Sequence, residues 1–357
     1  MAWGRLGPGR VQLAVEDTAA VELHTEGGPG VVSLHGLEPD RPGLVELTGP
    51  GVPGGRIALP FRTLAPLPGP ELYRFAAVSD LHLGARAYGM FHTMREKPQP
   101  DEPYTVRMAR AAFAEAKAWG AERLVAKGDI THHGEIDQWV CFRDLLDEAG
   151  LVADAVPGNH DVEPRRELDP DDALEKIGLE PNPDGCRWID VPGLRIVLID
   201  STLLEVRRGH VAHLHEVVRD AVSSTDLPVW IGMHHHLEPF RWSYFYPPGV
   251  RGHHTSRFLD EVAAGNPNAF ITSGHTHRNR RRDVGSLVLT EVGSPQDYPS
   301  TWAAYTVHEA GIRQVSRRIA DASCVPWIEY SRRAAGTLWG RWSPGRLEAR
   351  CFNHLWT

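Results

Sequence analysis

The sequence predicts a protein of the α/β class with a small all-β domain at its N-terminus. Between residues 11 and 61, short runs of alternating apolar and polar residues are separated by Gly, Pro and Asp turns, a pattern typical of short β-strands. From Tyr73 onward, apolar strand-like runs alternate with helix-length amphipathic segments, as in a sheet covered by helices. Between the two patterns lies Pro-Leu-Pro-Gly-Pro at 66–70, which predicts a stiff linker and a domain boundary.

Composition narrows the class of protein further. The 357 residues are 41% hydrophobic and 24% charged, which is typical of a globular protein with one large domain and a smaller one. The net charge of −8 argues against broad nucleic-acid binding, because that needs a basic surface. The four cysteines lack the spacing of a zinc site or a disulfide framework, and no apolar run would serve as a signal peptide or cross a membrane. We therefore expect a cytoplasmic protein with no membrane partner.

We expect three regions along the chain. Residues 1–68 would form a small β-sandwich-like module, 69–318 the α/β domain, and 319–357 a tail rich in Trp and Arg that packs on the core. Gly-Leu-Glu-Pro-Asp at 36–40, followed by Leu-Val-Glu-Leu at 44–47, resembles the corner of a fibronectin type III-like domain. Gly43 departs from that pattern, because it stands where such domains usually place the corner tyrosine.

The α/β part contains six apolar runs that predict strands, at 75–78, 124–126, 153–156, 195–199, 229–233 and 269–272. Helices are expected between them at 106–119, 135–149, 211–222 and 256–264, and further strands at 286–292, 302–307 and 312–316. The six strands all end in polar residues. A sheet edge built in this way is suited to holding a ligand.

Five of these strand ends carry short motifs: Asp-Leu-His at 80–82, Gly-Asp at 128–129, Gly-Asn-His-Asp at 158–161, His-His-His at 234–236 and Gly-His-Thr-His at 274–277. One such motif alone is ordinary turn chemistry. Five in this order resemble the calcineurin-like metallophosphoesterase superfamily over residues 73–310. The resemblance implies the α/β/β/α four-layer sandwich of that superfamily.

The resemblance also implies a pair of divalent metal ions. Two cations roughly 3.5–4 Å apart can neutralise phosphate oxygens and make hydroxide available near neutral pH. Mixed carboxylate, imidazole and amide ligands suit Mn, Fe, Zn or Co. Carried over position by position, the implied ligands are Asp80, His82 and His277 for the first metal, Asp129 as the bridge, and Asn159, His234 and His275 for the second.

Two points of this ligand set depend on local geometry. The family's usual proline does not follow the histidine triplet directly, so the register could slip by one and make His235 the ligand in place of His234. Residues two apart in a strand face the same side, so Asp80 and His82 can converge if the backbone stays extended. The same reasoning applies to His275 and His277.

His160 and Asp161 are the implied catalytic residues. In the family the histidine at this position lies over the scissile phosphate, where its imidazolium stabilises charge and can protonate the leaving alkoxide. Asp161 is a candidate partner that keeps His160 oriented and protonated.

The implied reaction is hydrolysis of a small phosphodiester, such as a cyclic nucleotide, by attack of a metal-bound hydroxide. Gly-Asp-Ile-Thr at 128–131 and the Gly-Asn-His-Asp motif look like those of bacterial class III cyclic nucleotide phosphodiesterases. His132 stands where purple acid phosphatases place their tyrosine ligand, which argues against that branch. The alternatives are a phosphomonoesterase or nucleotide pyrophosphatase using the same site and, from another class, a non-catalytic metal-binding scaffold.

Specificity is expected to come from loops at 86–103 and 237–255 that overhang the site. The second loop is rich in aromatic residues, which either stack on a flat leaving group or pack the loop down: Trp242, Tyr244, Phe245 and Tyr246. The arginines at 278 and 280–282 favour a solvated strand face, or pairing with Asp283, over phosphate contacts. His92 and His132 are expected at the surface or beside the site rather than as ligands, and His236 is expected in a loop.

Overall fold

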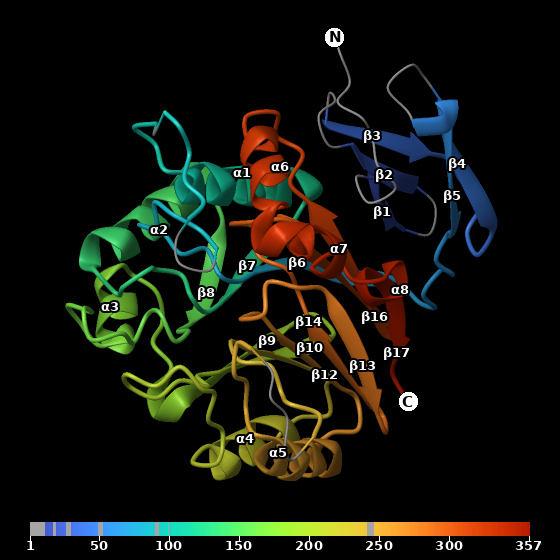
Figure 1. Cartoon of the computed structure of the whole chain (residues 1–357). Helices are drawn as coiled ribbons and strands as arrows, with labels where there is room; N and C mark the ends of the chain where they lie inside the picture. The colour runs from blue at the N-terminus through green and yellow to red at the C-terminus, as the bar shows by residue number, and fades with distance from the viewer. Residues whose placement is uncertain are drawn as a thin grey trace.

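Two six-stranded β-sheets pack face to face and carry helices on their outer sides in the computed structural model (Figure 1). The structure describes residues 11–16, 19–25, 30–48, 53–89, 93–98, 100–240 and 246–357. The sequence-based expectation of an α/β/β/α sandwich is confirmed by this arrangement.

The first sheet has the strand order β17-β16-β15-β6-β7-β8. Its strands are β6 (Glu71–Val78), β7 (Arg123–Lys127), β8 (Val152–Val156), β15 (Thr301–His308), β16 (Gly311–Arg318) and β17 (Cys351–Leu355). The strands β6, β7 and β8 are parallel, and they are connected by helices α1 (Tyr104–Trp119) and α2 (Ile136–Ala149). Ala76 and Val78 belong to the core cluster shared with these helices, whereas Phe75 and Ala77 face the second sheet. This alternation explains why β6 is apolar on both faces.

The second sheet has the strand order β13-β14-β12-β11-β10-β9. Its strands are β9 (Cys186–Val191), β10 (Leu194–Ile199), β11 (Val229–Met233), β12 (Ala269–Ser273), β13 (Arg280–Val284) and β14 (Leu287–Glu291). Helices α4 (His215–Ser223) and α5 (Gly252–Gly265) cover its outer face and share a core cluster with it. Aromatic rings fill the space between the sheets: Phe75 lies edge-on to Trp230 at 5.1 Å and stacks on Tyr305 at 4.9 Å. The α/β domain therefore has three apolar layers.

Strands β1 (Val11–Val15), β2 (Ala19–Thr25) and β3 (Gly30–His35) form one antiparallel sheet near the N-terminus, and β4 (Pro42–Thr48) pairs with β5 (Arg56–Arg62) after the short helix η1 (Pro53–Gly55). A small β region is thus present, but the fibronectin type III-like arrangement is not confirmed. Val15 and Val45 are buried in the core cluster that includes α1. The predicted linker follows Ala65, whose carbonyl oxygen accepts hydrogen bonds from Arg313 Nη2 and Asn353 Nδ2. The domain boundaries stay a prediction.

The C-terminal segment after β16 contains α6 (Val325–Ser331), η4 (Ala334–Thr337), α7 (Trp339–Trp342), α8 (Leu347–Arg350) and β17. Trp327 is buried and stacks on Tyr104 of α1 with ring centroids 3.7 Å apart. In contrast, Trp342 is 59% exposed. The short helix α3 (Pro170–Lys176) adds Ala173 and Leu174 to the core cluster that includes α1 and α2, and the short helix η3 (Pro183–Gly185) precedes β9. Among the described residues, no helix is long and apolar enough to cross a membrane.

Candidate metal centre

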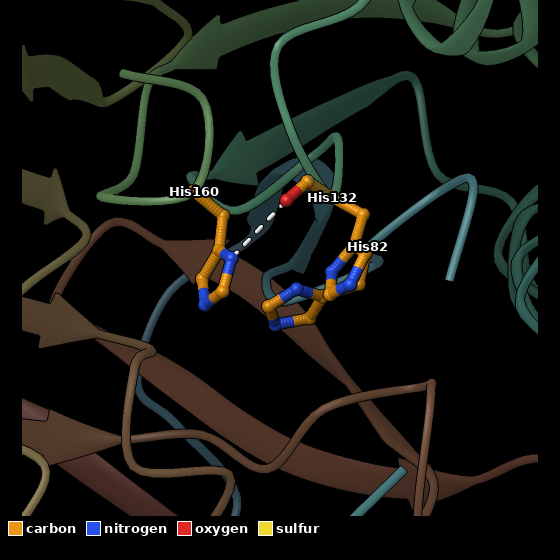
Figure 2. A group of neighbouring side chains, drawn as sticks. All are labelled: His82, His132 and His160. Carbon is orange, nitrogen blue, oxygen red and sulfur yellow. Dashed lines mark hydrogen bonds between the residues drawn. The ribbon is translucent and has the colours of Figure 1, made fainter. Parts of the chain in front are cut away.

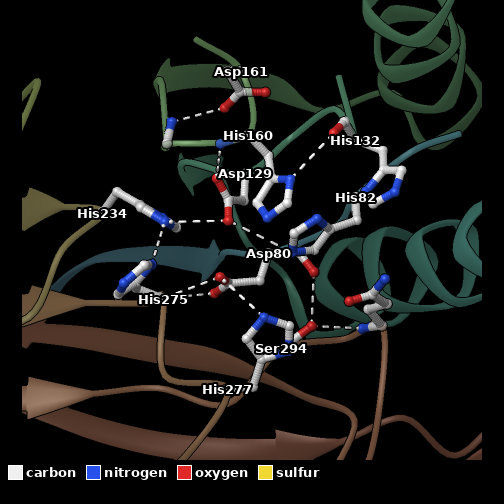
Figure 3. A network of polar contacts seen from close by, with 12 residues as sticks. Asp80, His82, Asp129, His132, His160, Asp161, His234, His275, His277 and Ser294 are labelled. Atoms are coloured by element: carbon white, nitrogen blue, oxygen red, sulfur yellow. Dashed lines mark hydrogen bonds and ion pairs between the residues drawn. The ribbon is translucent and has the colours of Figure 1, made fainter. Parts of the chain in front are cut away.

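The carboxyl ends of β6, β7 and β8 meet those of β11 and β12 at one edge of the sandwich, where their polar side chains converge (Figure 3). Groups of three possible metal ligands there have ligand atoms within 4.8 Å of one another: Asp80, His82 and His277; Asp80, Asp129 and His234; and His234, His235 and His275. All seven predicted metal ligands come from these strand ends.

The backbone at the site is not extended, so the expected reason for the convergence of Asp80 with His82 is wrong. Five of the predicted ligands have a left-handed φ: 57° at Asp80, 47° at His82, 49° at Asp129, 67° at His275 and 51° at His277. This region is sparsely populated by residues other than glycine and is typical of functional sites. The left-handed residues turn the chain at the sheet edge, and the backbone N–H groups of Asp80 and His82 bond to the carbonyl oxygens of Gly128 and Asp129, each at 2.9 Å.

Two glycines permit the close approach of the ligand-bearing segments. Gly128 has a φ of 80°, and a Cβ atom there would lie 2.7 Å from the ring of His234. A Cβ atom on Gly158 would lie 2.3 Å from Asp129 Oδ1. Any larger residue at either position would push apart the segments that carry the site.

Asp129 lies between the two groups of imidazoles. Its Oδ2 atom is 3.6 Å from His82 Nε2 and 3.3 Å from His234 Nε2, while its Oδ1 atom accepts a hydrogen bond from the backbone N–H of His160 at 2.8 Å. Burial raises the pKa of this carboxyl, but His234 and His160 outweigh burial and lower the pKa well below its usual range. The carboxylate is therefore ionised and reaches both groups, as a bridging ligand must.

The second-sheet histidines each donate one ring N–H to an oxygen atom outside the site. His234 Nδ1 bonds to the carbonyl of Lys127 at 3.0 Å, His275 Nε2 to that of Pro248 at 3.2 Å, and His277 Nδ1 to Asp297 Oδ1 at 2.5 Å. Carbonyl and carboxylate oxygens only accept, so in each neutral imidazole these bonds place the N–H on the outer nitrogen and leave the inner nitrogen available to a cation. The inner nitrogens face one another or Asp80: His234 Nε2 is 3.1 Å from His275 Nδ1, and His277 Nε2 is 3.3 Å from Asp80 Oδ1.

Local geometry favours His234 over His235 as the ligand. The rings of both are buried, but His235 Nδ1 bonds to Ser201 Oγ at 2.9 Å and its Nε2 bonds to the carbonyl of Arg207 at 3.2 Å. Both ring nitrogens of His235 are thus engaged by the loop after β10, whereas Nε2 of His234 faces Asp129. His236 is buried, and burial lowers its pKa to about 4.

Two buried polar atoms at the centre have no hydrogen-bond partner among the described residues. They are Asn159 Oδ1 and His82 Nδ1. A buried amide oxygen without a partner is costly unless a cation or water satisfies it. The Asn159 amide oxygen, the imidazoles of His82, His234, His275 and His277, and the carboxylates of Asp80 and Asp129 together fit the oxygen and nitrogen donor set of divalent transition metals.

His160 lies beside this donor set, with its ring stacked on that of His132 at 5.4 Å and edge-on to His82 at 4.6 Å (Figure 2). His160 Nδ1 is 3.0 Å from Glu163 Oε1 and 3.2 Å from the carbonyl oxygen of His132. Burial lowers the pKa of His160, but Asp129 and Glu163 outweigh it and raise the pKa to about 9. The imidazolium form is thus favoured by two carboxylates.

Asp161 makes different contacts from those expected. Its carboxylate accepts hydrogen bonds from the backbone N–H groups of Gly158, Ile130 and Thr131 and from Thr131 Oγ1, at 2.6–3.2 Å. Within the described chain, Asp161 makes no hydrogen bond to the His160 ring. The consecutive side chains of His160 and Asp161 point to different sides. Asp161 links the loops after β7 and β8 through its hydrogen bonds to Thr131 and Gly158. Glu163 is the carboxylate beside the His160 imidazole.

Several site residues were missed by the sequence reasoning. Glu163 follows His160 by three residues, and this spacing was its only signal. Asp297 and Ser294 carry no motif, yet Asp297 bonds to His277, and Ser294 Oγ donates to the carbonyl oxygen of Asp80 at 2.7 Å. Lys127 is fully buried and crosses between the sheets to Thr272 Oγ1 and the carbonyl of Ser273, and burial lowers its pKa to about 7.

The loops expected over the site do reach it. Tyr88, in the loop after β6, donates to Asp297 Oδ2 at 2.6 Å, and Pro248, in the loop after β11, contacts His275. Trp242, Tyr244, Phe245 and His92 lie outside the described residues. Arg280, Arg281 and Arg282 lie in the edge strand β13, where Arg281 pairs with Asp283 as predicted. Arg278 precedes the strand and is buried, so the expectation of a solvated face is wrong for this residue.

Comparison with known proteins gives the same result as the geometry. The family model described as calcineurin-like phosphoesterase matches residues 73–279. The chain is 27% identical over 220 residues to the 3',5'-cyclic adenosine monophosphate phosphodiesterase CpdA of Pseudomonas aeruginosa, covering 59% of this chain and 72% of that protein. It is 25% identical over 177 residues to a Psychrobacter sp. (strain PRwf-1) protein named "Probable cyclic nucleotide phosphodiesterase", covering 46% and 49% of the two chains.

Among solved structures, a purple acid phosphatase from yellow lupin (Lupinus luteus) seeds aligns with a TM-score of 0.51 and 13% identity, over 89% of this chain and 69% of that one. At this identity the likeness concerns the fold alone. The family model covers more than half of the chain, and its residues include all seven predicted metal ligands and both predicted catalytic residues. The chain therefore belongs to the calcineurin-like phosphoesterase family and is a hydrolase that acts on phosphoric ester bonds.

Proposed function

We propose that this protein is a phosphodiesterase that uses two divalent metal ions to hydrolyse small phosphodiesters. The observation that carries the proposal is the position of Asp129, whose Oδ2 atom lies between His82 Nε2 at 3.6 Å and His234 Nε2 at 3.3 Å. A carboxylate that faces ligands of two adjacent sites can bridge two cations and fix their separation.

The residues divide into two sites that share this bridge. Asp80, His82 and His277 would hold the first cation, and Asn159, His234 and His275 the second, with Asp129 common to both. Bound there, Mn, Fe, Zn or Co would supply hydroxide near neutral pH and offset the charge of the phosphate. The orphaned Oδ1 of Asn159 supports this assignment, because a neutral amide oxygen coordinates without adding charge.

His160 is the proposed general acid. Its Nδ1–H is held by Glu163 and by the carbonyl of His132, so its Nε2–H is the proton that can be given to the leaving alkoxide. The stacked His132 ring and the edge of His82 restrict the orientation of the His160 ring. Such a positioned acid contributes about 10²–10⁴ in rate. Asp161 acts on the same step indirectly, by holding together the loops that carry Asp129 and His160.

A cyclic nucleotide is the proposed substrate class, on the strength of the relative named as a cyclic AMP phosphodiesterase. The second relative, whose name also refers to cyclic nucleotides, adds to this support. Phosphomonoesters and nucleotide pyrophosphates remain alternatives, since one bimetal site can serve all three. All four cysteines are free thiols, in keeping with the predicted cytoplasmic location.

The test uses the full chain, freed of metal and then loaded with Mn, Fe, Co or Zn, with bis-p-nitrophenyl phosphate as substrate. We expect turnover with at least one metal, and Asp129→Ala should reduce it to background because both sites lose their shared ligand. Asp283→Ala, an exposed carboxylate of β13, is the matched control and should keep full turnover. Retained metal binding without hydrolysis of any phosphate ester would favour the scaffold alternative instead. Relative kcat/KM values for cyclic nucleotides, monoesters and pyrophosphates would then rank the substrate classes.

A further inference from the structure

Asp297 is a buried carboxylate that receives three hydrogen bonds at the first metal site. It is fully buried and follows β14 in a loop that carries no recognisable motif. Its Oδ1 atom accepts from His277 Nδ1 at 2.5 Å, and its Oδ2 atom accepts from Tyr88 OH at 2.6 Å and from Trp339 Nε1 at 2.8 Å. One of these three donors, His277, belongs to the proposed ligand set.

Trp339 reaches this carboxylate from the C-terminal segment. It begins helix α7, and its indole N–H also contacts the carbonyl of Tyr298 at 2.8 Å, next in sequence to Asp297. Two further contacts hold the same loop: Trp327 Nε1 donates to the carbonyl of Gln296 at 2.7 Å, and Ser331 Oγ accepts from the backbone N–H of Tyr298 at 3.0 Å. Side chains of α6 and α7 therefore form hydrogen bonds with three consecutive residues of this loop, 296–298.

The same C-terminal segment also contacts the two residues that follow His277. The ring of Trp342 lies 4.1 Å from the guanidinium carbon of Arg278, which is 2% exposed. The backbone N–H of Asn279 donates to the carbonyl of Ser343 at 2.9 Å. The C-terminal segment thus contacts both the partner of the His277 ring and the two residues that follow His277.

We propose that residues 325–345 form a positioning element of the metal centre, in which Trp339 holds Asp297 against His277 and thereby sets the affinity of the first site for its cation. This inference rests on the proposed metal-dependent function. The segment acts through Asp297 and does not contact the cation itself.

The physical basis is the orientation of a ligand imidazole by an outer carboxylate. Asp297 fixes an N–H of His277 on Nδ1, so that Nε2, which lies 3.3 Å from Asp80 Oδ1, is the nitrogen that would bind the cation. Partners of this kind typically change metal affinity by about 10–100-fold when they are removed. Loss of the indole N–H leaves Tyr88 as the one side-chain donor to Oδ2 of Asp297, so the carboxylate is less firmly held and constrains the His277 ring less.

The experiment titrates Mn²⁺ into metal-free full-length protein and follows the two binding steps by calorimetry at a temperature well below unfolding. Trp339→Phe removes the N–H and keeps an aromatic ring. Asp297→Asn places an amide NH₂ opposite the Tyr88 and Trp339 donors. Trp356→Phe is the control, because Trp356 belongs to the same C-terminal segment but lies at the far end of the first sheet, where its backbone N–H, which the substitution keeps, donates to the carbonyl of Ala310. The melting temperature of each metal-free variant is measured in parallel.

We expect one binding step to weaken by about 10–100-fold in Asp297→Asn and by a smaller factor in Trp339→Phe, with the other step unchanged. Trp356→Phe should bind Mn²⁺ as the wild type does. Wild-type affinities in folded Trp339→Phe would overturn the inference and leave the proposed function intact. Equal weakening of both steps, or the same loss in Trp356→Phe, would show a general effect on folding and also overturn it. Failure of the wild type to bind any of Mn²⁺, Fe²⁺, Co²⁺ or Zn²⁺ would refute the proposed function itself.

Discussion

The two sheets contribute chemically different halves of the metal centre. The first sheet supplies both carboxylates, the amide and the proposed general acid, together with His82, all at the ends of β6, β7 and β8. The second sheet supplies only imidazoles, at the ends of β11 and β12. All the anionic donors therefore come from the first sheet, the second sheet adds only neutral ones, and the two halves meet at Asp129 and His234.

The halves also differ in how their residues are held. On the first sheet, short hydrogen bonds between neighbouring strand ends fix the backbone, as where Asp161 binds the N–H groups of Gly158 and Thr131. On the second sheet, each ligand imidazole is fixed by an oxygen far away in sequence, such as Lys127 for His234. Both halves share left-handed backbone at their ligands. The comparison teaches that hydrogen bonds between neighbouring strand ends hold the first half, whereas tertiary contacts with ring nitrogens hold the second.

The largest effect on metal content and turnover is expected at the histidine triplet, 234–236, which tests how the second-sheet half is held. His234→Ala should remove one Mn²⁺ from the protein and lower turnover to that of an enzyme without its second metal, because Nε2 of His234 faces Asp129. In His235→Ala, metal content should be retained, because both of its ring nitrogens bond to the loop at Ser201 and Arg207. Elemental analysis of the two purified variants checks the assignment. The reverse outcome would shift the register by one residue.

A somewhat smaller effect is expected within the first-sheet half, at two adjacent residues. His160→Ala should lower kcat by about 10²–10⁴ while both metals stay bound, since the imidazole is proposed to give a proton and not to coordinate. Asn159→Ala should weaken the second metal, because it removes the buried Oδ1. Metal titration alongside turnover separates the two roles. Metal loss in His160→Ala would make His160 a ligand together with His82 and His132.

The smallest effect concerns the pH dependence of His160. Glu163 helps to raise the pKa of His160, whose protonated form is the proposed acid. Removing that charge in Glu163→Gln lowers the pKa of His160. Its protonated form is then lost at a lower pH, so the alkaline limb of the pH–rate profile shifts to lower pH. Activity at acidic pH should change little. The comparison variant is Asp161→Asn, which should lower the melting temperature by disturbing four hydrogen bonds. An unmoved alkaline limb in Glu163→Gln would remove Glu163 from the mechanism.

Much of the α/β domain could be predicted because its strands are short apolar runs that end in polar motifs. The run at 229–233 coincides with β11, and the runs that predicted β7, β8 and β12 fall short by one residue at one or both ends. The helix expected at 211–222 begins later, at His215, because the residues before it form turns. The edge strand β9 was missed because its residues alternate between partly buried and exposed positions and lack a continuous apolar run.

The ligand residues of the candidate site were predictable because they belong to short local motifs. The motifs named the ligands, but a backbone that was assumed to be extended is left-handed at five of them. The partner of His160 was expected at Asp161 and is found at Glu163, because adjacent side chains in this turn point to opposite sides.

The sequence by itself determined the class of fold, the family and the identity of the residues at the strand ends, because apolar periodicity and short motifs are properties of neighbouring residues. Only the tertiary structure decided which ring nitrogen of each histidine faces the site, and that Asp297 and Trp339 stand behind His277. Asp297 is 20 residues from His277 along the chain and Trp339 is 62, and no local pattern links them. Such contacts arise from the packing of the loop after β14 and of the C-terminal helices, where hydrogen-bond geometry is set by the whole fold.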